Sequence, residues 1–435
     1  MKWLRNMNWV EKIVLEHSEL EAPSSFWYWS ALSSISAVVK DNIWIHRQIY
    51  DLYPNVYVMF HADSGLKKGP PVAMARRLVS AVNNTKIIGG RSSIQGILKD
   101  LGTNNGYSLP GGKVVKSEKS VAFICSSELS SSIVEDRVAT KILTDLYDRQ
   151  YNLGEWRSLL KMETFTLKDP TVSMLTATNE AMTEDFFTKS AIQGGYFART
   201  FIVYEKESDN INSLSVPLKT EINYPKSAEY LKQLTNLKGG FEPLGSLTET
   251  DAHHRKIRNL KTGEIEYYTE AGYLYEEWYR NFKLDIRRNK TKDETGTLNR
   301  FGDSVLKVAM LLSLAREPKL VISMEAMREA IIQSEKLIGN IRQTTMGSQG
   351  FSVSKSFKNA ILKELYERDN HQATRTKLME KMWMHYGDAS EFDEMVNSLE
   401  QAGLIKYIPQ GNQIIIFMPD DQVAAFQSFF SGKTR

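Results

Sequence analysis

The sequence contains one cysteine and seven histidines among 435 residues, and this scarcity excludes several classes of protein. With Cys125 alone, no disulfide can form within the chain, which excludes a small disulfide-stabilised fold. Cysteine and histidine do not recur at the spacing of zinc ligands, so the pattern predicts no metal site of that kind.

Long hydrophobic runs and a strong charge of either sign are also absent. No run of about 18 apolar residues occurs, so we expect no membrane-spanning helix. Charges interrupt the apolar positions of residues 1–17, which predicts an amphipathic helix and not a signal peptide. The net charge of +3 permits nucleic-acid binding but is too small to indicate it alone. We therefore expect a cytoplasmic protein.

The hydrophobic pattern predicts an α/β fold. Hydrophobic residues make up 42% of the chain and charged residues 25%, as in ordinary globular proteins, and the length suffices for two or three domains. Short apolar runs separated by helical stretches favour a parallel sheet. The predicted strands lie in residues 56–82 (followed there by a loop and a helix), 119–130, 169–182 and 198–206.

The rest of the chain divides by composition. Residues 207–250 are polar without a clear period, and we expect them to be irregular. Helical patterns follow at 265–290, 304–317 and 323–343, and a Gly/Ser-rich stretch follows these helices. Three further helices and two strands around a "QGN" turn predict a winged helix. The expected segments are an N-terminal helical segment (1–48), an α/β core (49–250), a helical lid (251–343), a linker (344–354) and a winged helix (355–435).

The first predicted strand leads into a loop that has the outline of a phosphate-binding loop. Such a loop needs inward backbone N–H groups, a lysine for the phosphates and a hydroxyl for magnesium. With Lys68 as that lysine, Ala62 and Lys67 take the two glycine positions and Gly69 the hydroxyl position. Only the lysine matches the pattern. A solvated basic loop is therefore the alternative interpretation.

The ends of the later strands carry polar side chains in the order expected for the catalytic residues of an ATPase core. Glu128 follows the second strand, where an ATPase places the acid that activates water, although Ser127 precedes it and "SSEL" is also a helix-capping pattern. Asn179 ends the third strand and is able to polarise water, or simply to form a turn. Arg199 precedes the fourth strand. It is either an arginine finger for the phosphate of a neighbouring subunit or one half of a surface ion pair. The joint order favours one site over four unrelated features.

Six stretches together resemble the helicase-like P-loop proteins of phages, prophages and plasmids, over roughly residues 20–340. They are "SELEAPSSFWYWSALSSIS", "LYPNVYVMFHADSGLKKG", "ICSSELSSSI", "LTDLYD", "DPTVSMLTATNEAM" and "GGYFARTFIVYE". The resemblance implies a P-loop NTPase core of the AAA+ or RecA-like type. It also implies ATP and Mg²⁺ as cofactors, a homo-oligomeric ring with a hexamer as the expected size, and a bacterial host cell. The expected partners are single-stranded or forked DNA and a primase or replication initiator.

The resemblance also implies roles for individual residues. Glu128 would be the catalytic acid, Asn179 the water-sensing residue and Arg199 a finger given to the neighbouring subunit. The phosphate loop would consist of Ser64, Gly65, Lys67, Lys68 and Gly69. The departures are His61-Ala62-Asp63 in place of Val-Gly-Pro, Ser127 in place of Asp, and Pro70 after Gly69.

Basic residues suggest where DNA would bind. The interval between Glu128 and Asn179 resembles the pore hairpin of ring helicases, with a solvated loop as the alternative. Its candidate DNA contacts are Arg149, Trp156, Arg157, Lys161 and Lys168. A basic run at 279–292 lines a channel or forms a solvated helix face. Arg300 is a candidate to contact the nucleotide phosphate from above.

The winged helix does not favour sequence-specific DNA reading. A recognition helix needs donors for bases and phosphates, whereas this third helix carries Glu391, Asp393, Glu394 and Glu400. We expect it to contact protein or to position the ring instead. Two functions stay open for the whole chain: an ATP-driven DNA helicase or translocase of a mobile element, and a helicase-derived ring with a degenerate site that acts as a DNA-binding scaffold or loading factor.

Overall fold

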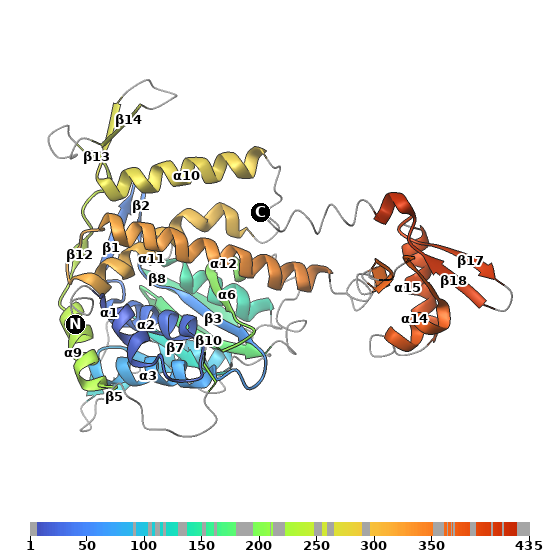
Figure 1. The fold of residues 1–435 in the computed structure, drawn as a ribbon. Coiled ribbons are helices and arrows are strands. Elements are labelled where there is room, and N and C mark those ends of the chain that lie inside the picture. The colour runs from blue at the N-terminus through green and yellow to red at the C-terminus, as the bar shows by residue number, and fades with distance from the viewer. Residues whose placement is uncertain are drawn as a thin grey trace. The chain divides into compact units, whose positions relative to one another are not determined.

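The computed structural model divides into two compact units, residues 1–344 and 345–435, which are described separately (Figure 1). The structure describes residues 7–89, 93–102, 107–108, 114–115, 119–128, 137–149, 154–160, 163–179, 195–208, 210–211, 222–247, 255–258, 265–288, 296–350, 361–362, 364–366, 368, 370–382, 389–401, 403–410 and 413–423. None of the helices in these ranges is long and apolar enough to cross a membrane.

A five-stranded sheet forms the centre of the first unit. Its order is β11-β3-β10-β7-β4, and every neighbouring pair is parallel. The strands are β3 (Tyr57–Ala62), β4 (Lys86–Ile88), β7 (Val121–Ser126), β10 (Thr171–Asn179) and β11 (Thr200–Tyr204). The predicted mixed α/β class and parallel sheet are confirmed. The three-residue strand β4 was not predicted, because it is too short to show a period.

The two faces of the sheet belong to two hydrophobic cores. Along β3, Val58 and Phe60 join one core while Tyr57 and Met59 join the other, as the two-residue period of a strand requires. Helices α4 (Ile94–Leu101) and α6 (Arg137–Tyr147) cover the second face. The first face is covered by α2 (Ser24–Val39) and α3 (Gly69–Val82), with α1 (Trp9–Glu16) behind α2 (Figure 1).

Helix α2 is buried for almost its whole length, so the predicted N-terminal helices belong to the core of the sheet. Its serines need partners because a buried hydroxyl without a hydrogen bond is costly. Ser36 Oγ donates to the carbonyl oxygen of Pro54 at 2.9 Å and lies 2.8 Å from Ser173 Oγ on β10. These contacts fix α2 directly on the sheet. Strands β1 (Ile43–Arg47) and β2 (Tyr50–Leu52) then lead the chain into β3.

The expectation of an irregular segment over 207–250 is wrong for residues 224–234, which form helix α9 (Tyr224–Leu234). Asn223 caps this helix by accepting a hydrogen bond from the Lys226 backbone at 3.0 Å, and Pro225 occupies a first-turn position that suits proline. Ala228, Leu231 and Leu234 are buried. The cap and the apolar spacing were both present in the sequence as signals.

The helices predicted for the lid are present as α10 (Glu270–Arg288), α11 (Thr297–Arg316) and α12 (Met324–Gly350). Helix α11 shares its buried face with α2 and lies inside the core of the first unit. Helix α12 continues through residues 344–350, where we expected linker, because each further residue extends a helix at little cost once it has nucleated.

Short strands that the sequence did not predict complete the first unit. Strands β13 (Gly245–Leu247), β14 (Arg255–Arg258) and β15 (Ile265–Tyr268) form an antiparallel sheet in the order β13-β15-β14. Strand β12 (Gly239–Gly240) pairs with β1, and β5 (Tyr107–Ser108) pairs with β6 (Val114–Val115).

The second unit has its own small core around Phe392 and Leu378. Helices α14 (Arg375–Met382) and α15 (Ala389–Gln401) pack with an antiparallel sheet of order β16-β18-β17. The strands are β16 (Gln372–Thr374), β17 (Lys406–Gln410) and β18 (Gln413–Phe417). The two expected helices and the strand pair are confirmed. Most of the helix expected at 355–368 lies outside the described residues.

Candidate functional site

The loop between β3 and α3 lies at the carboxyl edge of the central sheet. Gly65 has φ +99° and Lys67 has φ +48°, and the Lys67 backbone N–H donates to the Gly65 carbonyl oxygen at 2.7 Å. Lys67 occupies the position at which the phosphate-loop pattern has its second glycine. The left-handed backbone is therefore retained there without glycine, at a cost of roughly 1–2 kcal/mol.

The ammonium of Lys68 is folded back into this loop. Its Nζ donates to the carbonyl oxygens of Ala62 and Asp63, each at 2.7 Å, and the residue is only 9% exposed. Burial lowers the pKa of Lys68, while the Asp63 carboxylate acts in the opposite direction. The loop thus holds a cation whose present partners are two neutral carbonyl groups. An anion would be a stronger partner than either of them.

The helix that follows offers fewer donors than an ordinary phosphate loop. Helix α3 begins at Gly69, and the next two residues are Pro70 and Pro71. Proline suits the first turn of a helix, but it has no N–H. The helix dipole still favours an anion here, but two backbone donors that would bind phosphate oxygens are missing.

The loop, Asn179 and Glu128 are brought to the same edge of the sheet. Asn179 ends β10 and pairs in register with Ala62 of β3. Glu128 follows β7, the next strand, and is exposed. The Ser126 hydroxyl donates to the Glu128 carbonyl oxygen at 2.8 Å, which shapes the strand end. Three of the residues that the sequence singled out are therefore at the ends of adjacent strands.

The usual magnesium ligands are not present at this edge. Gly69 lacks the hydroxyl of the pattern, and Ser127 stands where the resemblance places an aspartate. Within the described part of the chain, no group of three or more His, Cys, Asp and Glu side chains gathers as a metal site. Asp63 and Ser64 are exposed in the loop and are the nearby oxygen donors. The residues present fit the phosphates of a nucleotide better than they fit its metal ion.

His61 is a feature of this edge to which the sequence reading gave no role. It is 2% exposed on β3, and its ring lies 5.1 Å from that of Tyr204 between centroids. Burial and, to a smaller extent, the nearby positive charge of Lys68 together lower its pKa to about 4, against an opposing effect of Asp63. His61 is therefore neutral at pH 7, and the cations of the loop are the buried Lys68 and the exposed Lys67.

Arg199 lies at the opposite, amino edge of the sheet. It ends the short 3-10 helix η4 (Phe197–Arg199), and the next residue, Thr200, pairs with Tyr57 at the start of β3. The six residues of β3 separate the two edges by roughly 16–20 Å. Arg199 is therefore remote from Lys68 of its own chain.

Asp148 holds Arg199 in place. Arg199 Nε donates to Asp148 Oδ1 at 3.0 Å, Nη2 donates to Oδ2, and Nη1 donates to the Gly195 carbonyl oxygen at 2.9 Å. The side chain of Arg199 is 7% exposed. The ion pair that we considered as the alternative for Arg199 is present, although it is buried and not on the surface.

Arg300, in the first turn of α11, lies beside Arg199. Its Nη1 is 3.8 Å from Asp148 Oδ2, and its side chain is 46% exposed. Arg300 was expected to contact the nucleotide phosphate from above; the packing of α11 places it at the amino edge of the sheet, so it does not reach a nucleotide held by Lys68 of its own chain.

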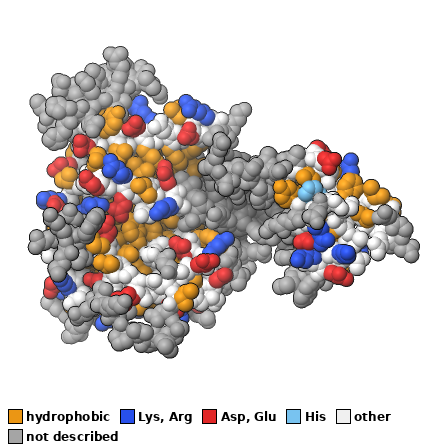
Figure 2. All heavy atoms as spheres, viewed as in Figure 1, with side chains coloured by type: hydrophobic (Ala, Val, Ile, Leu, Met, Phe, Trp, Pro, Cys, Tyr) orange, Lys and Arg blue, Asp and Glu red, His pale blue; other side chains and the backbone are white. Residues whose placement is uncertain are grey.

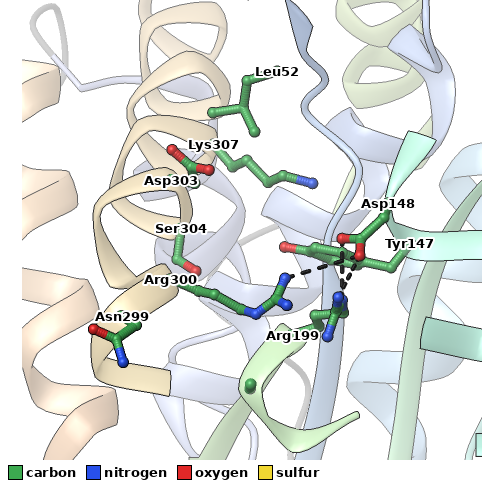
Figure 3. Close-up of a pocket in the computed structure, with 10 residues that line it drawn as sticks. Leu52, Tyr147, Asp148, Arg199, Asn299, Arg300, Asp303, Ser304 and Lys307 are labelled. Atoms are coloured by element: carbon green, nitrogen blue, oxygen red, sulfur yellow. Dashed lines mark hydrogen bonds and ion pairs between the residues drawn. The ribbon is translucent and has the colours of Figure 1, made fainter. Parts of the chain in front are cut away.

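These residues line a cavity of about 360 Å³ between the end of α6, η4 and α11 (Figure 3). Its lining consists of Leu52, Tyr147, Asp148, Ala198, Arg199, Asn299, Arg300, Asp303, Ser304 and Lys307.

Lys307, to which no role was assigned from the sequence, is 1% exposed in the wall of this cavity. Its Nζ donates to the backbone and side-chain oxygens of Asn55, each at 2.9 Å, and lies 3.8 Å from the centre of the Tyr147 ring. Burial lowers the pKa of Lys307 to about 7, while Asp148 and Asp303 act in the opposite direction.

The interval expected to reach DNA contains a two-stranded hairpin of β8 (Glu155–Leu160) and β9 (Glu163–Lys168). Arg157 and Lys168 are exposed on it, and Arg157 pairs with Glu155. Trp156 is half-buried against the second core and hydrogen-bonds to Asp145, which limits its freedom to stack on a base. Lys161 lies outside the described residues.

Arg149 is not available to DNA, contrary to expectation. It is 4% exposed, and its Nη2 lies 3.4 Å from Asp41 and 3.3 Å from Asp169. Its guanidinium also lies 5.0 Å from the centre of the Tyr53 ring. Arg149 is a structural cation at the amino edge of the sheet.

The basic run of α10 is partly neutralised within the chain. Arg280 pairs with Glu276 at 2.6 Å, and Lys283 donates to the Leu298 carbonyl oxygen at 3.3 Å, whereas Arg287 and Arg288 are exposed. On the face that Figure 2 shows, acidic and basic side chains are interspersed over the first unit. The described side chains on this face form no basic stripe of the kind that tracks a nucleic-acid backbone.

A scan against protein-family models found no family that matches this chain, and a search of the curated proteins found no relative.

Proposed function

We propose that the first unit is a P-loop nucleotide-binding core of the AAA+ type, with ATP held at the carboxyl edge of the central sheet. The observation that carries the proposal is the position of Lys68 between β3 and α3, with Asn179 and Glu128 at the ends of the two adjoining strands. Ligands of open parallel sheets bind outside the carboxyl ends of the strands.

Each residue has a definite part in this proposal. Lys68 exchanges two carbonyl partners for phosphate oxygens, which are stronger acceptors because they are charged. Asn179 orients the attacking water, and the exposed carboxylate of Glu128 accepts its proton. Mg²⁺ would neutralise charge on the phosphates, with Asp63 or Ser64 as its protein ligand in place of the missing hydroxyl and aspartate.

The wider function that we propose is an ATP-driven DNA helicase or translocase of a mobile element, working as a homo-oligomeric ring. Arg199 supports an oligomer because it is remote from Lys68 of its own chain and so reaches a nucleotide only on another copy. Single-stranded or forked DNA would contact the β8–β9 hairpin, where Arg157 and Lys168 are exposed. A primase or replication initiator is the expected protein partner.

The second unit fits a winged helix, and we propose that it contacts protein. Its helix α15 carries Asp393, which is engaged by Arg375 of α14 through two bonds of 2.7 and 2.8 Å. Arg375 is thereby withdrawn from any phosphate, and the remaining acidic side chains of α15 would repel one.

A second candidate function is a ring that binds nucleotide and DNA without hydrolysis, as a scaffold or loading factor. Specific observations favour it: Pro70 and Pro71 remove two donors, Gly69 supplies no hydroxyl and Ser127 no carboxylate for the metal, and Asp148 occupies Arg199.

Hydrolysis of ATP by the full chain, with and without single-stranded DNA, separates the two candidates. The motor proposal expects DNA-stimulated turnover that a Glu128→Gln chain loses while it still binds ATP. DNA binding without turnover would contradict the motor and support the scaffold. A chain that does not bind ATP at all would contradict both.

A further inference from the structure

The cavity at the amino edge of the sheet contains a guanidinium whose hydrogen-bonding capacity is not used. Arg300 has five N–H donors, and its contact in the described structure is the 3.8 Å approach to Asp148, which is longer than a hydrogen bond. Figure 3 shows the guanidinium directed at the carboxylate that Arg199 already binds. The Asp148 carboxylate therefore lies near two arginines but accepts hydrogen bonds from Arg199 and not from Arg300.

The charges around the cavity are unequal. Three basic side chains line it (Arg199, Arg300 and Lys307, of which Lys307 is only partly protonated near neutral pH), against the two carboxylates of Asp148 and Asp303. Asp303 also accepts a hydrogen bond from the Tyr50 hydroxyl at 2.9 Å and lies 3.8 Å from Arg47, so a fourth cation borders the same group. The enclosed space therefore favours an additional negative charge.

The donors that surround the cavity suit a tetrahedral anion. Arg300 and Ser304 project from the first two turns of α11, whose amino end is the positive end of the helix dipole. Both oxygens of the Asp148 carboxylate already accept hydrogen bonds from Arg199, whereas a phosphate group would bring further charged oxygens for Arg300 and a hydroxyl. The volume of about 360 Å³ accommodates a phosphate or diphosphate group.

We propose that this cavity is a second anion site, in which Arg300 and Arg199 bind the terminal phosphate of a small phosphate compound beside Asp148, the internal counter-ion whose negative charge weakens this binding. Lys307 remains on Asn55 and Tyr147 and contributes its charge without direct contact. The site is separated from Lys68 by the length of β3, so its occupancy does not require the proposed nucleotide site.

The test uses the full chain with Lys68→Met, which removes the buried cation of the carboxyl edge. Pyrophosphate is titrated calorimetrically at low ionic strength without divalent metal. We expect one binding site, about tenfold weaker binding after Arg300→Gln, and unchanged binding after Arg287→Gln, which removes the same charge from the exposed end of α10. No binding, or equal losses in both variants, would overturn the site.

Two further titrations test the role of Asp148 as counter-ion and the kind of phosphate compound that binds. A folded Asp148→Asn chain should bind pyrophosphate about tenfold more tightly, and unchanged affinity would overturn the role of Asp148. ADP is titrated in parallel: equal affinity for both ligands means that the site reads only the phosphate end, and tighter binding of ADP means that the nucleoside contributes. Arg300 is partly exposed, so we expect the Arg300→Gln chain to fold. It therefore tests the site even if the Asp148→Asn chain does not fold.

Discussion

Protonation of His61 should destabilise the first unit in weak acid. The pKa of His61 is lowered from the usual value near 6.5 to about 4 in the folded chain, because its ring is buried beside Lys68. The unfolded chain therefore binds a proton that the folded chain rejects between these two values. Stability is then fully present above about pH 6.5 and falls as the pH decreases towards 4.

The size of the effect follows from the shift. A displacement of about 2.5 pKa units corresponds to roughly 3 kcal/mol once both states are protonated. Between pH 7.5 and pH 5.0 the same relation gives a loss of about 2 kcal/mol. No discount for solvent screening is needed, because His61 is only 2% exposed.

Urea unfolding followed by tryptophan fluorescence measures this loss, since all tryptophans except Trp383 lie in the first unit. His61→Asn is the matched variant, because it keeps a polar side chain of similar size that does not titrate. Its stability should change by about 2 kcal/mol less than that of the parent chain between the two pH values. His17 is also buried, and its pKa is lowered, but it is present in both chains and cancels. Equal pH dependence of the two chains would refute the argument.

Four further substitutions, at three positions, test other parts of the two edges. Lys68→Ala should abolish binding of a fluorescent ATP analogue, and unchanged binding would contradict the phosphate site. Arg199→Ala should lower unfolding stability by about 3–5 kcal/mol, because it leaves the buried Asp148 carboxylate without its main partner; a loss below about 1 kcal/mol in urea unfolding would contradict this. Lys67→Gly should be neutral or slightly stabilising because it removes left-handed strain, whereas Lys67→Val should lower the melting temperature by several degrees. Equal melting temperatures of the two Lys67 variants would contradict the strain.

The sheet was predictable from sequence because its signal is local. Each long strand is a largely apolar run, and a polar residue stands at its end or in the loop that follows, so the positions of Lys68, Glu128 and Asn179 at one edge followed from the pattern. The short elements gave no such signal. Strand β4 and the sheet of β13, β14 and β15 depend on pairing between distant segments, which no window of sequence contains.

The errors among the basic residues have one physical cause. A lysine or arginine in a sequence is expected at the surface, and only distant partners bury it. The partner Asp41 of Arg149 is 108 residues away, and the partner Asn55 of Lys307 is 252 residues away. Lys307 did leave a trace, because Leu306, Val308 and Ala309 surround it with apolar residues in a helical run.

The distance between Lys68 and Arg199 makes the oligomer itself testable. If one nucleotide needs both side chains, each must come from a different copy, because the length of β3 separates them within a chain. A Lys68→Ala chain and an Arg199→Lys chain, which keeps a cation beside Asp148, should each lack DNA-stimulated hydrolysis. Mixing equal amounts should restore it in part, because about a quarter of the interfaces then combine an intact Lys68 with an intact Arg199 across a head-to-tail contact. If the Arg199→Lys chain alone hydrolyses ATP, hydrolysis does not require Arg199, and its distance from Lys68 no longer implies a second copy. Two controls are needed: the parent chain must be active, and subunits must exchange between the mixed chains. If the mixture is then still inactive, Lys68 and Arg199 do not act together on one nucleotide.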